Sequence, residues 1–323
     1  MTDVPLTRRA LLKITAALVM AADDRAMAVP AAGSIIDLMP DFWRVYDPVA
    51  KAPIKDQSSA LTQGFFQVHE VLFARAGIHH ADAEVIEDWL GKVSPMIPAI
   101  RRLHRRFAND YGAYVRRFLG AFPDFDKAAA PTFLIPSLFR FDAHLEPSDG
   151  QLPLFFGMDG IVKYHGENAN LSVLFSHETY HCYQSQKNPS VMMADKFPLF
   201  AGLWVEGGAT WVSEKLNPNA SLLNVLLDDK ALAAMTGDQI KIAASTLMMK
   251  IDSTDEADAA IFFSAGWTGA WPARSGYLFG LHIARRITPT LTAANFASLP
   301  LRDMRALYAA RVAAIADSGN LDA

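Results

Sequence analysis

The chain has 323 residues, of which 51% are hydrophobic and 20% are charged. This composition excludes a disordered chain, a collagen-like fibre and a disulfide-rich scaffold, and it supplies enough apolar material for a sizeable core. The formal net charge of -4 offers no broad attraction to nucleic acid, so no nucleic-acid partner is expected. Because Cys182 is the sole cysteine, packing or a metal must hold the fold in place of an intramolecular disulfide.

Residues 1–28 have the features of an export signal. The arginine pair Arg8 and Arg9 is followed by an apolar stretch too short to cross a bilayer, and residues 26–28 (AMA) fit a small-x-small cleavage site. The pattern resembles a twin-arginine signal. This resemblance implies a mature chain that begins near Val29 and lies in the periplasm or is secreted, without stable membrane insertion after cleavage. An amphipathic N-terminal helix is the alternative.

Residues 58–122 are expected to form a helical layer. Leu61, Phe65, Val68 and Leu72 recur at the three- and four-residue steps that place side chains on one face of a helix. We assign residues 29–128 to this N-terminal layer and residues 129–323 to a second region, and we expect the two to form one continuous globular unit.

Four arginines in the helical layer share one helical face: Arg101, Arg102, Arg105 and Arg106. They make the most concentrated basic patch in the sequence. Since the whole chain is acidic, we expect a solvated or ion-paired helix face here.

The pattern changes after residue 123. The aromatic and β-branched runs 131–141 and 153–164 predict strands of a small sheet, with a turn cluster at residues 145–151 between them. Helices are predicted again from residue 170, including 198–215, 231–250, 276–287 and 301–315. The expected fold class is therefore α+β, mostly helical, with a small mixed or antiparallel sheet.

The most informative motif is HExxH at residues 177–181. Positions four apart lie on the same face of a helix, so the imidazoles of His177 and His181 can reach one ion. Glu178 lies beside the first histidine, where it can take a proton from a water without being a ligand itself. The motif predicts a metal site with an adjacent general base.

A second motif follows in the run LWVEGGATW at residues 203–211. Two histidines and one glutamate form a recognised ligand set for catalytic zinc, which keeps its fourth position for water, and Glu206 would supply that glutamate. Gly207 and Gly208 are poor helix formers, so we expect them to allow this helix to pack closely against the HExxH helix.

Together, the two motifs resemble those of the gluzincin metallopeptidases, and most closely those of thermolysin-like families with peptidase-MA-type domains. The resemblance covers residues 177–211. It implies a zincin core in which His177, His181 and Glu206 bind Zn²⁺, with Glu178 as general base in the hydrolysis of a peptide or protein substrate. Thr210 stands where some relatives carry an aspartate that orients a histidine. Which residue orients the ligating histidines in this chain is therefore left open.

Further residues are expected near the cleft. Residues 272–282 resemble the G-Y-x-x-G segment of several such families, which makes Tyr277 a candidate oxyanion donor, with Arg274 and His282 as alternates. A core aromatic is the competing interpretation of Tyr277. The resemblance also suggests that an edge strand at residues 157–164 pairs with the substrate backbone.

Two other functions remain open. In one, the chain is a non-catalytic exported protein that binds metal or peptide, with a cleft lined by Trp204, Trp211, Trp267 and Trp271. In the other, it is a helical interaction domain without zinc. Open metal coordination separates a catalytic site from a structural one. The sequence predicts neither the substrate, nor endo- or exopeptidase action, nor the oligomeric state.

Overall fold

The computed structural model describes residues 35–147 and 150–322. The expected export signal, residues 1–28, lies outside this part of the chain. The described residues divide into two compact units, and each is considered by itself. One comprises residues 35–116 and 126–169, and the other comprises residues 117–125 and 170–322.

Helices dominate the N-terminal part of the chain, as predicted. The helix α4 buries one face through the residues Ile86, Trp89, Leu90 and Val93, and Asp82 caps its first turn by accepting a hydrogen bond from Val85. Helix formation begins before the predicted residue 58. The elements are α1 (Met39–Val49), α2 (Ile54–Leu61), the π-helical segment η1 (Thr62–Phe66), α3 (Glu70–Arg75), α4 (Ala83–Val93), the 3₁₀ segment η2 (Ser94–Met96) and α5 (Ile97–Ala121).

A four-stranded mixed sheet belongs to the same unit. The strands are β1 (Ile35–Asp37), β2 (Thr132–Ile135), β3 (Ala143–Leu145) and β4 (Leu154–Gly157), in the spatial order β1-β2-β4-β3. The pairs β1·β2 and β2·β4 are parallel, whereas β3 and β4 are antiparallel. The two predicted runs 131–141 and 153–164 are thus neighbours in one sheet, although each strand is only four residues long.

The predicted edge strand at residues 157–164 is wrong. The strand β4 ends at Gly157 and continues as the helix α6 (Met158–His165). In addition, β4 is a central strand that pairs on both sides, so it has no free edge for a peptide backbone.

Asp159 explains why the chain turns into a helix at this point. Its carboxylate is buried in the first turn of α6, where it accepts hydrogen bonds from the backbone amides of Ser137 and Phe139 at 2.5 and 2.7 Å and from the indole of Trp89 at 2.9 Å. An acidic group is also favoured at a helix N-terminus. These long-range contacts override the strand preference of the aromatic and β-branched residues.

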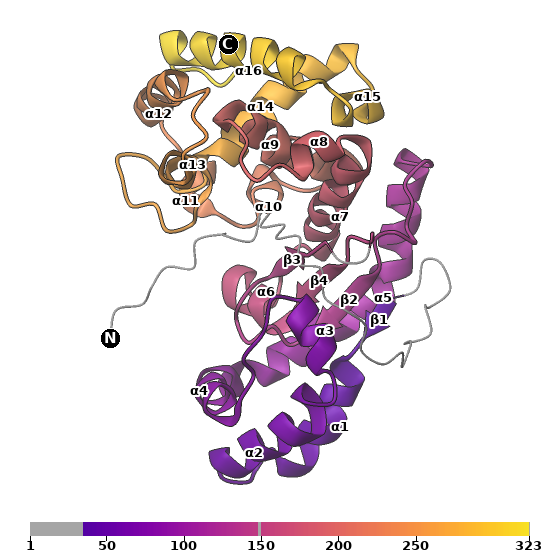
Figure 1. Ribbon diagram of the computed structural model, residues 1–323. Helices are drawn as coiled ribbons and strands as arrows, with labels where there is room; N and C mark the ends of the chain where they lie inside the picture. The colour runs from indigo at the N-terminus through magenta and orange to yellow at the C-terminus, as the bar shows by residue number, and fades with distance from the viewer. Residues whose placement is uncertain (1–34, 148–149, 323) are drawn as a thin grey trace. The chain divides into compact units, whose positions relative to one another are not determined.

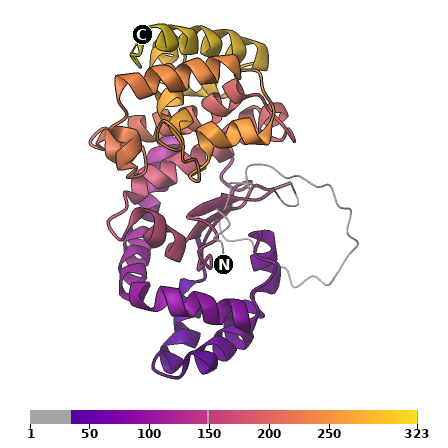
Figure 2. The same ribbon diagram turned by 90° about the vertical axis from the view of Figure 1, so that its left-hand side faces the viewer.

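Helices make up the second unit. The predicted helices are confirmed to within a few residues, except that residues 231–250 form two helices rather than one. The helix α9 is central and packs against α7, α14 and α16 (Figure 1), while α12 lies beside α16 (Figure 2). The elements are α7 (Leu171–Lys187), α8 (Pro189–Met192), α9 (Leu199–Leu216), α10 (Leu222–Val225), α11 (Lys230–Ala233), α12 (Gly237–Met249), α13 (Glu256–Phe263), α14 (Ser275–Ile287), the 3₁₀ segment η3 (Thr288–Thr290), α15 (Ala293–Ala297) and α16 (Leu301–Ser318).

The helices α7 and α9 are buried on nearly all sides. In α9, every residue from 199 to 213 is buried, and in α7 the same holds from 173 to 184. A helix without a solvent face forms the core of its unit, and its polar side chains must be paired with one another or with a ligand.

The expected fold class, α+β with mostly helices and a small mixed sheet, is confirmed. Within the described chain, no helix is both long and apolar enough to span a membrane. The basic helix face on α5 is partly ion-paired, as predicted: Arg101 pairs with Asp47, and Arg102 pairs with Glu167.

Candidate metal centre

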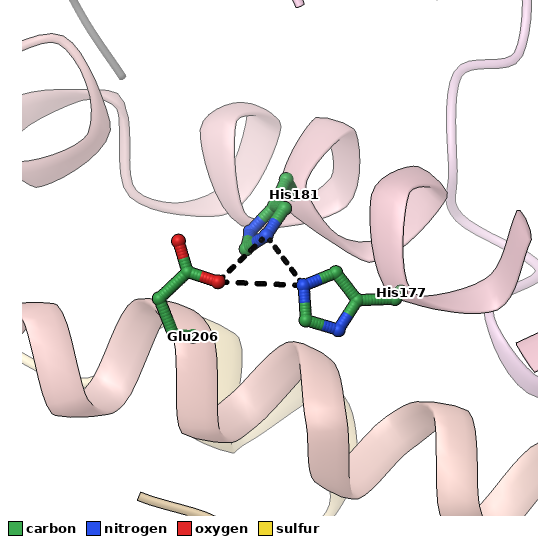
Figure 3. Close-up of side chains that lie close together, drawn as sticks. All are labelled: His177, His181 and Glu206. Carbon is green, nitrogen blue, oxygen red and sulfur yellow. Dashed lines mark hydrogen bonds and ion pairs between the residues drawn. The ribbon is translucent and has the colours of Figure 1, made fainter. Parts of the chain in front are cut away.

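The helix α7 presents two imidazoles on one face. Asn170 begins the helix by accepting a hydrogen bond from the Val173 amide at 3.2 Å. His177 and His181 then follow one turn apart and are only 1% and 3% exposed. Their Nε2 atoms lie 3.2 Å from each other (Figure 3), so the four-residue spacing has placed both imidazoles at one point, as expected.

Glu206 reaches the same point from α9. Its Oε2 atom lies 3.4 Å from Nε2 of His177 and 3.6 Å from Nε2 of His181 (Figure 3), and the residue is 2% exposed. The three residues predicted as ligands therefore meet in the core of one unit. This buried triad could hold a metal ion.

Gly207, the neighbour of Glu206, packs against α14 and not against α7, the helix that was expected. A Cβ added to Gly207 would lie 2.2 Å from the Cα atom of Gly280 on α14, and one added to Gly280 would lie 2.4 Å from the carbonyl oxygen of Leu203. The backbones of α9 and α14 are therefore in direct contact, which only glycine allows. The predicted approach of Gly207 to the HExxH helix is wrong.

Gly208 is the glycine that faces α7. A Cβ at this position would lie 3.2 Å from Nε2 of Gln184 and 3.4 Å from the ring of Tyr180, both on the HExxH helix. The close packing of α9 on α7 that the glycine pair predicted is therefore confirmed for Gly208. The two glycines hold α9 between α7 and α14.

Gln184 supports the second histidine. Its Oε1 atom lies 3.0 Å from Nδ1 of His181, and its amide nitrogen donates to the carbonyl oxygens of Trp204 and Val205 at 3.3 Å each. A hydrogen bond from Nδ1 to Gln184 leaves the Nε2 lone pair of His181 directed at the triad. The sequence analysis did not identify Gln184, although its position three residues after His181 on the same helix was a usable indication.

The electrostatics of the triad favour a cation. Burial lowers the pKa of His181, but the hydrogen bond and charge of Glu206, with the charge of Glu178, outweigh burial and raise that pKa above its ordinary value. A negative field of this kind stabilises a proton or a metal ion at the imidazoles. Glu178 is itself buried, with 7% of its surface exposed.

The donor set is open. Among the described residues, the cluster of possible metal ligands contains His177, His181 and Glu206 and no fourth His, Cys, Asp or Glu. Glu178 thus acts on the site electrostatically without being one of its ligands. Three protein ligands with an open fourth position are typical of a catalytic metal site, and four are typical of a structural one.

Tyr277 lies at the triad, as expected. Its ring stacks on that of His177, with centroids 6.0 Å apart and planes 14° apart, and the residue is 1% exposed. Arg274 is also close, with its guanidinium carbon 4.4 Å from the centroid of the Tyr277 ring. His282, the other alternate, instead contacts Asp322 and Arg285 at 3.1 and 3.3 Å.

Three of the four tryptophans proposed to line a cleft are buried in the core: Trp204, Trp211 and Trp271. Trp204 is fully buried and donates to the Phe296 carbonyl at 2.9 Å, and Trp211 packs on the same phenylalanine ring. Thr210 donates to the carbonyl of Glu206 in its own helix. Cys182 is buried, as expected for a small hydrophobic residue.

Three further histidines pair with carboxylates in the other unit. His104 contacts Asp37 and His165 contacts Asp142, each at 2.7 Å, and His144 lies 3.0 Å from Glu146. His165 is largely buried, with 7% of its side chain exposed. Among the described residues, none of these pairs belongs to a group of three or more possible metal ligands.

Comparison of the chain with protein-family models, with curated proteins and with solved structures gave no match.

Proposed function

We propose that this protein is a zinc-dependent metallopeptidase of the gluzincin type. Ligands arranged as a tetrahedron around zinc, each about 2.05 Å from the ion, would lie about 3.3 Å from one another. The three contacts between His177, His181 and Glu206 measure 3.2, 3.4 and 3.6 Å. This agreement is the observation that carries the proposal.

Charge balance favours a divalent ion over a proton. Two carboxylates, those of Glu206 and Glu178, are buried near two imidazoles, and buried carboxylates are favoured when a cation pairs with them. One dication at the triad would neutralise both. The combination of two nitrogen ligands and one oxygen ligand suits zinc among the common metals.

Each of several residues of the chain would have a separate role in the reaction. A bound zinc ion would supply Lewis acidity, lowering the pKa of water and polarising the scissile carbonyl. Glu178 takes a proton from the attacking water and returns it to the leaving amine. Tyr277, whose ring stacks on that of His177, would stabilise the oxyanion, and Gln184 would hold His181 in its ligating tautomer.

The proposal is tested first by metal content. Untagged protein should carry about one zinc ion per chain. His177→Ala should lose it, while His104→Ala, which alters a histidine in the other unit, should retain it. Absence of zinc after reconstitution with the ion would refute the metal site and favour the interaction-domain interpretation.

Catalysis is tested separately with Glu178→Gln, which preserves the shape of the side chain. We expect this variant to bind zinc like the wild type and to lose turnover on a fluorogenic peptide library by at least about a hundredfold, the size of a general-base contribution. Undiminished turnover would rule out this mechanism. A zinc-bound wild type with no turnover on any peptide would instead support the non-catalytic metal-binding function.

A further inference from the structure

Arg274 is a buried cation beside the triad. The residue is 8% exposed, and its Nε and Nη2 atoms have no hydrogen-bond partner among the described residues. Its guanidinium contacts the face of Tyr277, the ring that stacks on His177. Buried N–H groups of a charged side chain that lack acceptors are costly, so they are best explained by a ligand that accepts hydrogen bonds from them.

The backbone at Arg274 sharpens this argument. Its φ angle is +59°, in the left-handed region that glycine and asparagine adopt most easily. Strained backbone of this kind is concentrated at functional sites. Here it places the guanidinium at the start of α14, directly before the turn that carries Tyr277.

The loop before α14 holds further unsatisfied donors. Within the described chain, the indole nitrogens of Trp267 and Trp271 and the hydroxyl of Ser275 are buried without hydrogen-bond partners. The two indole rings lie 5.4 Å apart. The segment 267–275 is therefore rich in buried donors, and donors without acceptors suit an acceptor-rich ligand.

We propose that Arg274 binds a carboxylate of the substrate, so that the site acts on peptides with a free carboxylate close to the scissile amide. This inference rests on the proposed metallopeptidase function. A guanidinium presents two parallel N–H groups that match the two oxygens of a carboxylate, and the buried site strengthens the pair.

The reaction balances in atoms and charge. The oxygen of water bonds to the carbonyl carbon, the C–N bond breaks, and the proton removed by Glu178 passes to the amine nitrogen. Arg274 takes no part in these bond changes. Its role is to hold the substrate's existing carboxylate, so that the amide lies against the triad.

The test compares matched peptides on zinc-loaded, full-length Glu178→Gln protein, which should bind without turnover. One set is N-acetyl-Gly-Xaa with a free C-terminus, the second is the same set amidated, and the third is amidated with an internal Asp. Binding is measured by the shift in Tm and by tryptophan fluorescence. We expect at least tenfold weaker binding of the amides, and strong binding of the third set alone would identify a side-chain carboxylate as the source.

Arg274→Asn in the same background tests the residue itself. Asparagine tolerates the left-handed backbone and removes the charge, so the Tm without peptide should not fall, whereas the preference for free carboxylates should disappear. Arg274→Lys should restore part of the preference. Arg286→Asn, which alters an exposed arginine of the same helix, should leave it unchanged.

The outcomes separate this inference from the proposed function. Equal binding of acid and amide peptides, or a preference that survives in Arg274→Asn, would overturn the role of Arg274. A drop in Tm with the preference intact would identify a structural arginine. Zinc content, and hydrolysis of any of the three peptide sets by the wild-type protein, report on the metallopeptidase function independently of these results.

Discussion

At the residue scale, the candidate site depends on pairs of side chains one helical turn apart. The spacing of His177 and His181 was readable from the sequence, because four residues on a helix return to the same face. The same logic would have found Gln184. Glu206 could be assigned only through a motif, since its contact with the histidines spans two helices.

Gln184 gives a prediction about zinc affinity. Gln184→Met keeps the length of the side chain but removes the acceptor for His181, and losses of such supporting contacts cost about 10- to 100-fold in metal affinity. Gln184→Glu retains an acceptor oxygen and should bind zinc at least as well as the wild type. Competition titration with a zinc chelator measures both, and equal affinities in all three proteins would show that this contact is unimportant.

His282 gives a prediction about pH. Burial and the nearby charge of Arg285 lower the pKa of His282 in the folded state. The unfolded chain, whose histidine pKa is about 6.5, therefore takes up a proton first as the pH falls. The stability contributed by neutral His282 is present above about pH 6.5 and is lost as the pH drops through the lowered folded-state value.

The corresponding measurement is the free energy of unfolding of wild type and His282→Gln from pH 8 to pH 5. The wild type should lose more stability than the variant over this interval, because glutamine does not titrate. Parallel pH profiles would contradict the assignment. A greater loss of stability in His282→Gln than in the wild type would mean that the contribution of His282 has the opposite sign.

At the element scale, the helices were more predictable than the strands. The predicted bounds of α9, α14 and α16 agree with the observed helices to within a few residues. By contrast, the run at residues 153–164 has strand-like composition along its whole length, yet Asp159 turns its second half into a helix through contacts with residues that are distant in sequence. A local sequence pattern cannot reveal these contacts.

The contact between Gly207 and Gly280 was also beyond sequence reasoning, because it depends on where two helices cross. Gly280→Ala would force a methyl group to within 2.4 Å of the Leu203 carbonyl oxygen and 2.6 Å of the Gly207 Cα atom. We expect a destabilisation of about 1–3 kcal/mol or more, as for other overpacked sites. Urea unfolding measures this loss, and zinc affinity should fall with it because Glu206 adjoins Gly207.

Gly91→Ala is the matched control. This glycine lies within the helix α4, and an added Cβ would meet nothing within 4 Å. Alanine is the better helix former, so this variant should gain about 0.5–1 kcal/mol. Similar changes in the free energy of unfolding of Gly280→Ala and Gly91→Ala would indicate that the close approach of α9 and α14 is not rigid.

At the scale of the whole molecule, zinc should stabilise the fold by mass action. A ligand that binds only the folded state adds about 2.7 kcal/mol when its free concentration is 100 times its Kd. We therefore expect the Tm to rise with free zinc in calorimetry and to fall on addition of a chelator. His177→Ala should show neither change, and a Tm independent of zinc in the wild type would argue against the metal centre.

The helices α9 and α14 touch backbone to backbone where Gly207 meets Gly280. The helix α14 carries Tyr277 and Arg274, while α9 carries Glu206, and the two backbones touch at Gly207 and Gly280. A displacement of one helix at this contact therefore displaces the other, because no side chain lies between the two backbones to change its conformation instead. If α14 binds a peptide carboxylate and α9 binds zinc, as proposed, the two sites should be thermodynamically coupled, and the factor by which the peptide changes zinc affinity must equal the factor by which zinc changes peptide affinity.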